Sequence, residues 1–156
     1  SAPSAGEETS EEDIVYTVSG KKTVYGHYNE ELSDEVTQLI NSYRTKMGLK
    51  SLKVTCARSA AAGRQVLSSA YNYRSFSTIN SAKGLRTATV TAMGPGSAEF
   101  LVNSLTMCSS TERKIVNGSY RYIGVSVFAS AVPSGLIVSG APETGYRYYA
   151  VISLGR

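Results

Sequence analysis

The spacing of apolar side chains in the first third of the chain constrains its fold most strongly. They recur at positions i, i+3, i+4, i+7 and i+11: Val36, Leu39, Ile40, Tyr43 and Met47. This spacing places them on one face of a helix. Ser33 stands where a side chain caps a helix, and Gly48 stands where helices commonly end. We therefore predict a helix over residues 33–47 that buries one face.

Two more helices and a group of strands are predicted after this helix. Residues 55–70 are rich in alanine, so another element can approach them closely, and Ser97 caps a third helix that ends near Met107. The remaining pattern is a loop and then short β-prone runs: 71–86 as irregular loop, and 87–93, 120–129, 135–139 and 146–154 as strands. Helices followed by strands with tight turns predict an α+β fold with an antiparallel meander.

The 156 residues suit one domain, which we place at 14–156. Its first part, 14–30, is expected to be an extended arm. The preceding segment, 1–13, has the composition of a disordered acidic linker. Ser1 rather than Met stands first, so we expect a processed or trimmed chain from which any export signal has been removed. No apolar run is long enough for a transmembrane helix.

Charge is distributed unevenly along the chain. The first 13 residues hold five of the 12 acids and none of the 16 bases, so the rest has 16 bases against seven acids, a net charge of +9. A cationic body predicts attraction to anionic partners, such as a cell-wall polymer, lipid head groups or nucleic acid. We expect the ligand to be an anionic cell-wall polymer, a lipid or a host protein. Alternatively, the acidic segment screens the body and keeps it soluble. The chain has no nucleic-acid-binding motif, so we expect no specific nucleic-acid partner.

The chain has two cysteines, Cys56 and Cys108, and their separation fits no zinc motif. Each falls at the end of a predicted helix, so a disulfide between helix ends is one interpretation. It would require an oxidising, extracellular compartment. Two buried free thiols are the alternative.

Three stretches resemble the SCP-like branch of the CAP superfamily, in its bacterial form. Residues 36–52 are similar to the family's first helix, with Asn41, Arg44 and the Gly48-Leu49 pair in the family's pattern. Residues 98–127 resemble the segment that ends in an Ile-Gly-Val turn, here Ile123-Gly124-Val125, and 148–155 resemble the closing strand. The resemblance implies a three-layer α-β-α sandwich with a central antiparallel sheet, and an extracellular or cell-surface location.

The chain departs from this family at the metal site. Many members hold a divalent metal with two His and two Glu, but here Glu112-Arg113 stands in place of a His-Arg pair, and no Glu occurs at 89–91. The only histidine, His27, lies before the region of resemblance. We therefore expect no metal and no cofactor.

The resemblance and the side-chain chemistry together select five candidate residues for a degenerate cleft: Tyr73, Arg74, Glu99, Glu112 and Arg113. Tyr73 and Arg74 belong to an aromatic, basic segment that could stack on a sugar, a lipid or a base. Glu99 and Glu112 could form an acid pair, although each could equally be a solvated helix residue. As solvated helix residues, these glutamates could pair with Arg113 or Lys114.

These observations favour a secreted, non-catalytic binding module that acts as a monomer. Two alternatives remain open. One is a hydrolase that uses Glu99, Glu112 or His27, and the other is a structural appendage of a larger surface protein. The sequence shows no nucleophile beside a base, so it provides no positive sign of catalysis.

Overall fold

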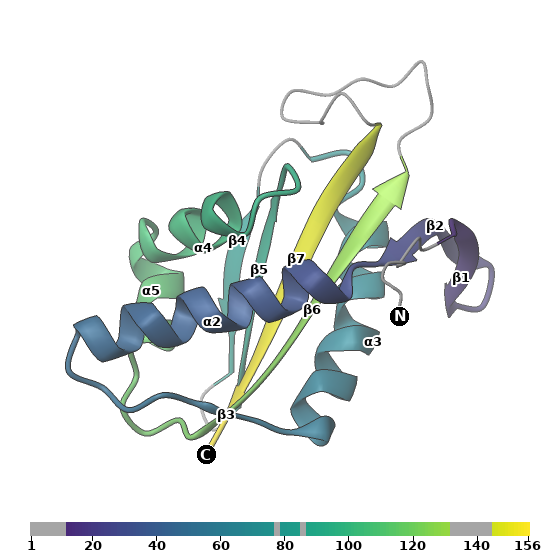
Figure 1. Ribbon diagram of the computed structural model, residues 1–156. Helices are drawn as coiled ribbons and strands as arrows, with labels where there is room; N and C mark the ends of the chain where they lie inside the picture. The colour runs from purple at the N-terminus through teal and green to yellow at the C-terminus, as the bar shows by residue number, and fades with distance from the viewer. Residues whose placement is uncertain (1–11, 77–78, 85–86, 132–144) are drawn as a thin grey trace, which may run out of the picture.

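The computed structural model describes residues 12–76, 79–84, 87–131 and 145–156, which form a sheet with helices on both faces (Figure 1). Predictions for residues 1–11 and for a strand at 135–139 lie outside these residues. The helices are α2 (Glu30–Lys46), α3 (Cys56–Asn72), α4 (Ala98–Thr106) and α5 (Ser109–Ile115). The strands are β1 (Ile14–Ser19), β2 (Lys22–Tyr28), β3 (Lys53–Val54), β4 (Asn80–Lys83), β5 (Thr87–Gly94), β6 (Tyr122–Ala131) and β7 (Tyr146–Gly155). None of the helices in the described residues is long and apolar enough to cross a membrane.

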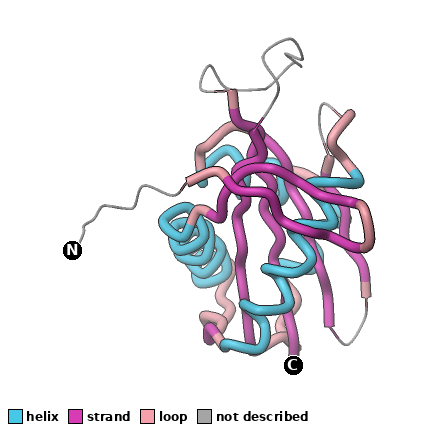
Figure 2. Tube along the Cα trace, turned by 90° about the vertical axis from the view of Figure 1, so that its right-hand side faces the viewer, coloured by secondary structure: helices cyan, strands magenta, loops and turns pink. Residues whose placement is uncertain are grey.

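The seven strands form one sheet in the order β1-β2-β6-β7-β5-β4, and the short β3 pairs with β6 from outside this path. Every pairing is antiparallel except that of β3 with β6. In Figure 1, α2 crosses in front of the sheet and α3 lies behind it. In Figure 2 the strands stand between these two helices. The predicted α+β class and the three-layer sandwich are therefore confirmed.

Each face of the sheet has its own apolar core. The core beneath α2, α4 and α5 includes Val36, Ile40, Leu101, Leu105 and Ile152, which are all fully buried. The core beneath α3 is smaller: Val24, Ala62, Val66, Ala70, Met93, Phe128, Tyr149 and Val151. Strands β6 and β7 contribute side chains to both cores, because successive side chains of a strand point to opposite faces of the sheet.

Helix α2 starts three residues earlier than the apolar stripe predicted. Asn29 is its cap, since the side-chain carbonyl of Asn29 accepts a hydrogen bond from the backbone N–H of Leu32 at 3.0 Å. Ser33, the predicted cap, instead connects the helix to the sheet. Its hydroxyl donates to the carbonyl of Asn29 at 2.8 Å and accepts from the N–H of Val127 at 2.9 Å. The helix ends at Lys46, and Gly48 follows with a φ of +81°.

Helix α3 packs unusually close to the sheet. A Cβ atom added at Gly124 of β6 would lie 2.0 Å from the backbone carbon of Arg58, so only glycine allows this approach. The small residues predicted in 55–70 allow this approach, and one of them, Ala62, is fully buried against the sheet. This close crossing fixes where α3 stands relative to β6 and to the short β3.

The predicted arm is the β1–β2 hairpin, and its start is held by a polar cluster. The Asp13 carboxylate lies 2.8 Å from Nδ1 of His27 and accepts a hydrogen bond from the hydroxyl of Tyr146 at 2.6 Å. This bond raises the pKa of Tyr146 to about 12. Asp13 therefore connects His27 of the hairpin to Tyr146 of β7.

Candidate functional site

The outer edge of β6 has a gap between its two partner strands. Strand β2 pairs with Phe128, Ala129 and Ser130, and β3 pairs with Tyr122 and Ile123. Residues 124–127 therefore have no strand partner on this edge. The sheet edge is open here, and open edges offer unpaired backbone groups to other chains.

The backbone groups of Val125 point into this gap. The carbonyl of Ile123 accepts from the N–H of Thr55 at 3.2 Å, and the carbonyl of Val127 accepts from the N–H of Asn29 at 2.8 Å. Because alternate residues of a strand direct their backbone groups to the same edge, the N–H and C=O of Val125 face outward between these two bonds. Within the described parts of the chain, no loop or side chain takes them up.

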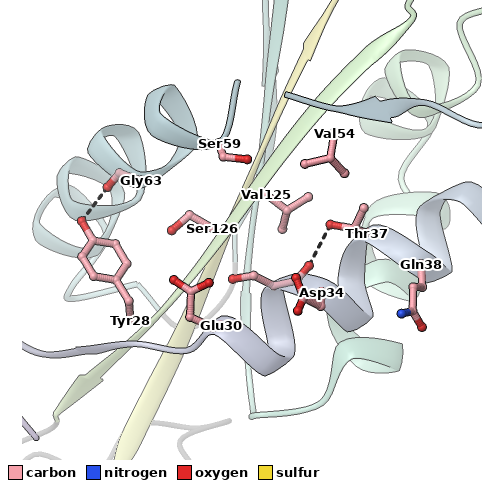
Figure 3. A pocket seen from close by; sticks show the side chains of 11 residues that line it. Tyr28, Glu30, Asp34, Thr37, Gln38, Val54, Ser59, Gly63, Val125 and Ser126 are labelled. Atoms are coloured by element: carbon pink, nitrogen blue, oxygen red, sulfur yellow. Dashed lines mark hydrogen bonds between the residues drawn. The ribbon is translucent and has the colours of Figure 1, made fainter. Parts of the chain in front are cut away.

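A cleft of about 510 Å³ lies over this gap, between the first halves of α2 and α3 (Figure 3). We call it the edge cleft. Most of the residues that line it have polar side chains, and they come from β2, α2, β3, α3 and β6: Tyr28, Glu30, Ser33, Asp34, Thr37, Gln38, Val54, Ser59, Gly63, Val125 and Ser126. Val54 forms an apolar wall and is 56% exposed.

Two carboxylates and several hydroxyls give the edge cleft its chemistry. Glu30 and Asp34 are exposed on successive turns of α2 and carry its negative charge. Ser126, which is only 8% exposed, lines the cleft, and its hydroxyl has no hydrogen-bond partner among the residues described. The two carboxylates favour a cationic group, and the hydroxyls and the open backbone favour a ligand with several hydrogen-bonding groups.

Three of the lining side chains are already held by the protein, and one of them is Ser33, whose hydroxyl bonds to Asn29 and Val127. The hydroxyl of Tyr28 donates to the carbonyl of Gly63 at 2.8 Å, which joins β2 to α3 across one end of the cleft (Figure 3). Burial, and to a lesser extent Tyr16, raises the pKa of Tyr28, so its hydroxyl stays protonated as a donor. The hydroxyl of Thr37 donates to the carbonyl of Ser33 at 2.8 Å. These residues shape the walls of the cleft, while Ser126 and Val125 keep groups available for a ligand.

Comparison with solved structures agrees with this architecture. An outer surface protein of Borrelia burgdorferi superposes with a TM-score of 0.56 at 15% identity, over 84% of this chain and 98% of that one. A cysteine-rich secretory protein of Staphylococcus aureus superposes with a TM-score of 0.50 at 15% identity, over 82% of this chain and 39% of that one. The fold is CAP-like. No protein-family model matches the sequence, and neither does any curated protein.

The metal site expected of many CAP proteins does not fit the residues present. Among the described residues, no group of three or more His, Cys, Asp or Glu side chains could hold a metal ion. The sequence resemblance places Thr89 and Thr91 where a family carboxylate is expected, and the carboxylate of Glu112 accepts a hydrogen bond from Tyr43. Threonine hydroxyls are poor ligands for a transition metal compared with histidine or carboxylate.

The sheet separates the five predicted cleft residues into two groups. Glu99 begins α4 and lines a shallow groove against α2, while Glu112 accepts a hydrogen bond from the hydroxyl of Tyr43 at 2.9 Å. This bond raises the pKa of Tyr43. Arg113 is exposed on α5, on the same face of the sheet.

Tyr73 and Arg74 lie at the end of α3, on the opposite face from those three residues. The Arg74 guanidinium stacks over the ring of Tyr71 at 4.1 Å from the ring centroid. The backbone carbonyls of Tyr73 and Arg74 accept hydrogen bonds from the buried guanidinium of Arg147. None of the five predicted residues lines the edge cleft.

The predicted disulfide between Cys56 and Cys108 is wrong, since both are free thiols. Cys56 begins α3 on one face of the sheet, and Cys108 precedes α5 on the other. Because the sheet lies between them, the two cysteines are not neighbours in space, although each lies at a helix end. The free thiol of Cys108 lies 3.2 Å from the hydroxyl of Ser110, and hydrogen bonds from Ser110 and Thr111 lower its pKa to about 7.

Sequence reasoning missed the edge cleft, although one wall carried a signal. Glu30, Asp34, Thr37 and Gln38 follow each other at the spacing of a polar helix face, opposite the apolar stripe. The same periodicity that predicted the helix could have singled out this polar face. The gap in the sheet edge has no such signal, because it depends on where β2 and β3 stop pairing with β6.

Proposed function

We propose that this chain is a non-catalytic binding module of a secreted or cell-surface protein, and that it binds an extended, basic segment of a protein in the edge cleft. The solved structures with this fold include an outer surface protein and a secretory protein, which supports the location. The loss of the family's metal-binding residues is part of the same proposal. Of the three partner classes expected from the sequence, the edge cleft favours a protein ligand.

The open stretch of β6 is the observation that carries this proposal. A peptide laid along the gap in extended form can accept a hydrogen bond from the N–H of Val125 and donate one to its C=O. Strand addition of this kind derives affinity from main-chain bonds and specificity from the side chains that flank them. Here the flanking groups are the exposed carboxylates of Glu30 and Asp34, which select lysine or arginine.

The charge of the cleft contrasts with the charge of the chain. The protein carries a net charge of +4, yet the edge cleft is lined by two acids and no base. Local complementarity of this sort determines which partner docks, and long-range charge affects mainly how fast it arrives. A basic peptide is therefore bound for its fit to the cleft rather than for attraction to the whole molecule.

The cleft lacks the groups that a hydrolase of the predicted kinds would use. Glu99, Glu112 and His27 lie outside it, and its lining contains no histidine, lysine or cysteine to activate a serine. Glu30 and Asp34 are exposed, whereas a carboxyl that serves as a general acid is normally shielded from water. These features favour binding over catalysis.

The test is a titration of the full chain with short acetylated peptides, followed by fluorescence anisotropy. A peptide of alternating threonine and lysine should bind, and the same peptide with glutamate in place of lysine should not. Methylating alternate peptide nitrogens removes the main-chain donors and should also abolish binding, because strand addition requires them.

Matched variants of α2 separate the cleft from general charge effects. The double variant Glu30→Gln/Asp34→Asn should bind the lysine peptide about tenfold more weakly. The control Glu31→Gln/Glu35→Gln removes the same charge from the same turns, but outside the edge cleft, and should bind normally. Equal losses in both double variants, or equal binding of the methylated peptide, would show that the edge cleft is not the binding site.

A further inference from the structure

A second, smaller pocket lies on the α3 face of the sheet, between α3 and the strands β4 and β5. We call it the α3 pocket. Its volume is about 50 Å³, and every residue that lines it is polar: Gln65, Ser69, Tyr73, Ser81, Lys83, Thr89 and Thr91. A volume of this size holds a small ion or one or two waters, and no larger molecule.

The pairing of β4 with β5 explains why these side chains converge. Ser81 lies opposite Thr91, and Lys83 lies opposite Thr89, so all four side chains point to the α3 face. Helix α3 covers them with Gln65, Ser69 and Tyr73, which recur every four residues and share one face of the helix. The floor and the roof of the pocket are thus both built from hydrogen-bonding groups.

Two hydroxyls in this pocket are buried without partners. Ser69 is 2% exposed and Thr91 is 4% exposed. No residue in the described ranges forms a hydrogen bond with either hydroxyl. Buried polar groups in proteins nearly always have a partner, and leaving one without a partner destabilises the fold. Two such groups that line one pocket therefore point to a bound species that hydrogen-bonds with them.

The charge around the pocket decides what that species is. The elements that enclose it, α3, β4, β5 and β7, contain no Asp or Glu. They contain Arg58, Arg64, Lys83 and Arg147. Arg147 is occupied by the carbonyls at the end of α3, and Arg58 donates to the hydroxyl of Ser153 at 3.3 Å. Lys83 is exposed at the pocket and has no carboxylate near it in sequence or on these elements.

We propose that the α3 pocket binds a single oxyanion group, a phosphate or a sulfate. Its oxygens accept hydrogen bonds from the hydroxyls of Ser69 and Thr91 and from the ammonium of Lys83. Charge-assisted bonds of this type are stronger than bonds between neutral groups. This site is separate from the edge cleft and does not depend on the function proposed for that cleft.

The chemistry admits a free anion or an esterified phosphate at the end of a larger molecule. Lys83 is exposed while Ser69 and Thr91 are buried, so the anion enters past Lys83 and any ester chain remains outside. The cationic body of the chain then attracts a phosphate carried by a surface polymer or a lipid. The experiment below distinguishes these sources.

The test is an amide NMR titration of the full chain with sodium phosphate, compared with sodium chloride at equal ionic strength. The amide signals of Ser69, Lys83 and Thr91 should shift with phosphate only. Glycerol phosphate, and vesicles of phosphatidylcholine with and without phosphatidic acid, form the other arms. Shifts with the inorganic ion alone identify a free anion, and shifts with the esters identify a phosphate-bearing ligand.

Variants show whether these groups form the site. Lys83→Gln and Thr91→Val should each weaken phosphate binding about tenfold, whereas Lys53→Gln on β3, with the same loss of charge, should not. Ser69→Val fills the pocket without changing charge and should also abolish binding, while circular dichroism confirms that it folds. If phosphate and chloride produce the same shifts, or if Lys83→Gln and Lys53→Gln behave alike, the proposal is wrong.

Discussion

The edge cleft and the α3 pocket are built by the same helix and the same sheet, yet they have opposite chemistry. The edge cleft measures about 510 Å³, is open to solvent and owes its charge to Glu30 and Asp34 of α2. The α3 pocket measures about 50 Å³, is largely enclosed and has Lys83 as its only charged lining residue. The acids come entirely from α2, because α3 and the strands around it carry none.

This difference separates binding from stability in a way that can be measured. The carboxylates of the edge cleft, Glu30 and Asp34, are exposed, so changing them alters ligand binding with little effect on folding. The hydroxyls of Ser69 and Thr91 are buried and have no hydrogen-bond partner among the residues that the structure describes, so they lower the stability of the unliganded protein. The α3 pocket should therefore show a trade between stability and binding that the edge cleft lacks.

The largest effect on stability and binding is expected where α3 crosses β6, because both the edge cleft and the α3 pocket depend on that contact. In Gly124→Ala the new Cβ would lie 2.0 Å from the backbone carbon of Arg58, so the helix must move away. We expect the free energy of unfolding in urea to fall by about 3 kcal/mol, with loss of both peptide and phosphate binding.

Gly63→Ala is the matched control for this substitution. Its Cβ would meet the hydroxyl of Ser126 at 3.9 Å, an ordinary contact, and Gly63 lies inside α3. Alanine should stabilise the helix by about 0.5–1 kcal/mol. If both substitutions had similar effects, the close crossing at Gly124 would not be what positions α3.

Thr91→Val is expected to give the next largest effect, and in the opposite direction. In buffer without phosphate or sulfate, removing the unpartnered hydroxyl should raise the free energy of unfolding by about 1 kcal/mol. Phosphate should then stabilise the wild type more than the variant, because the variant binds it about tenfold more weakly. Glu30→Gln provides the contrast from the edge cleft, with a change in unfolding free energy within about 0.5 kcal/mol. A large loss of stability in Thr91→Val would mean that its hydroxyl already has a partner.

The sequence predicted the framework better than either hollow. Periodicity and capping residues located α2, α3 and α4, because these signals are local. It missed β4, since Asn80–Lys83 is a polar run whose strand conformation comes from pairing with β5. Both hollows are assembled from segments far apart in the chain, and Ser69 meets Thr91 only through the packing of α3 on the sheet.

The two cysteines also show that local sequence signals do not determine which helices lie together. Both cysteines do lie at helix ends, as predicted. A disulfide between them, however, requires both helix ends to lie on one face of the sheet. Nothing local in the sequence around Cys56 or Cys108 states which face each helix covers. The predicted cleft of Glu99, Glu112, Arg113, Tyr73 and Arg74 was divided by the sheet for the same reason.

Tyr146→Phe tests whether the edge cleft and the α3 pocket respond separately to a change at the β1–β2 hairpin. This hairpin supplies Tyr28 to the edge cleft but nothing to the α3 pocket. The hydrogen bond to Asp13 raises the pKa of Tyr146 from 10.0 to about 12. The protonated phenol is therefore favoured in the folded state, and its contribution is complete below pH 10 and is lost as the pH rises through 12. The variant should lose about 0.5 kcal/mol at neutral pH and lack this alkaline decline in unfolding experiments.

Tyr25→Phe is the control for the tether, because Tyr25 is exposed on the same hairpin. Peptide binding should weaken in Tyr146→Phe, and phosphate binding should not change. If phosphate binding weakened as well, the two hollows would be coupled through the sheet, and they could not be treated as independent sites.

The smallest effect concerns the two thiols, which mark opposite faces of the same sheet. Because both are free, a thiol titration of the folded, unreduced protein should find two reactive groups per chain. The pKa of Cys108 is lowered to about 7, so much of it is thiolate at neutral pH and its alkylation should rise steeply between pH 6 and 8. Cys108→Ser should remove this phase and Cys56→Ser should retain it. If the protein showed no free thiol until it was reduced, Cys56 and Cys108 would have to be bonded to each other. That bond would require α3 and α5 to lie on the same face of the sheet. The edge cleft and the α3 pocket could then no longer be distinguished on structural grounds.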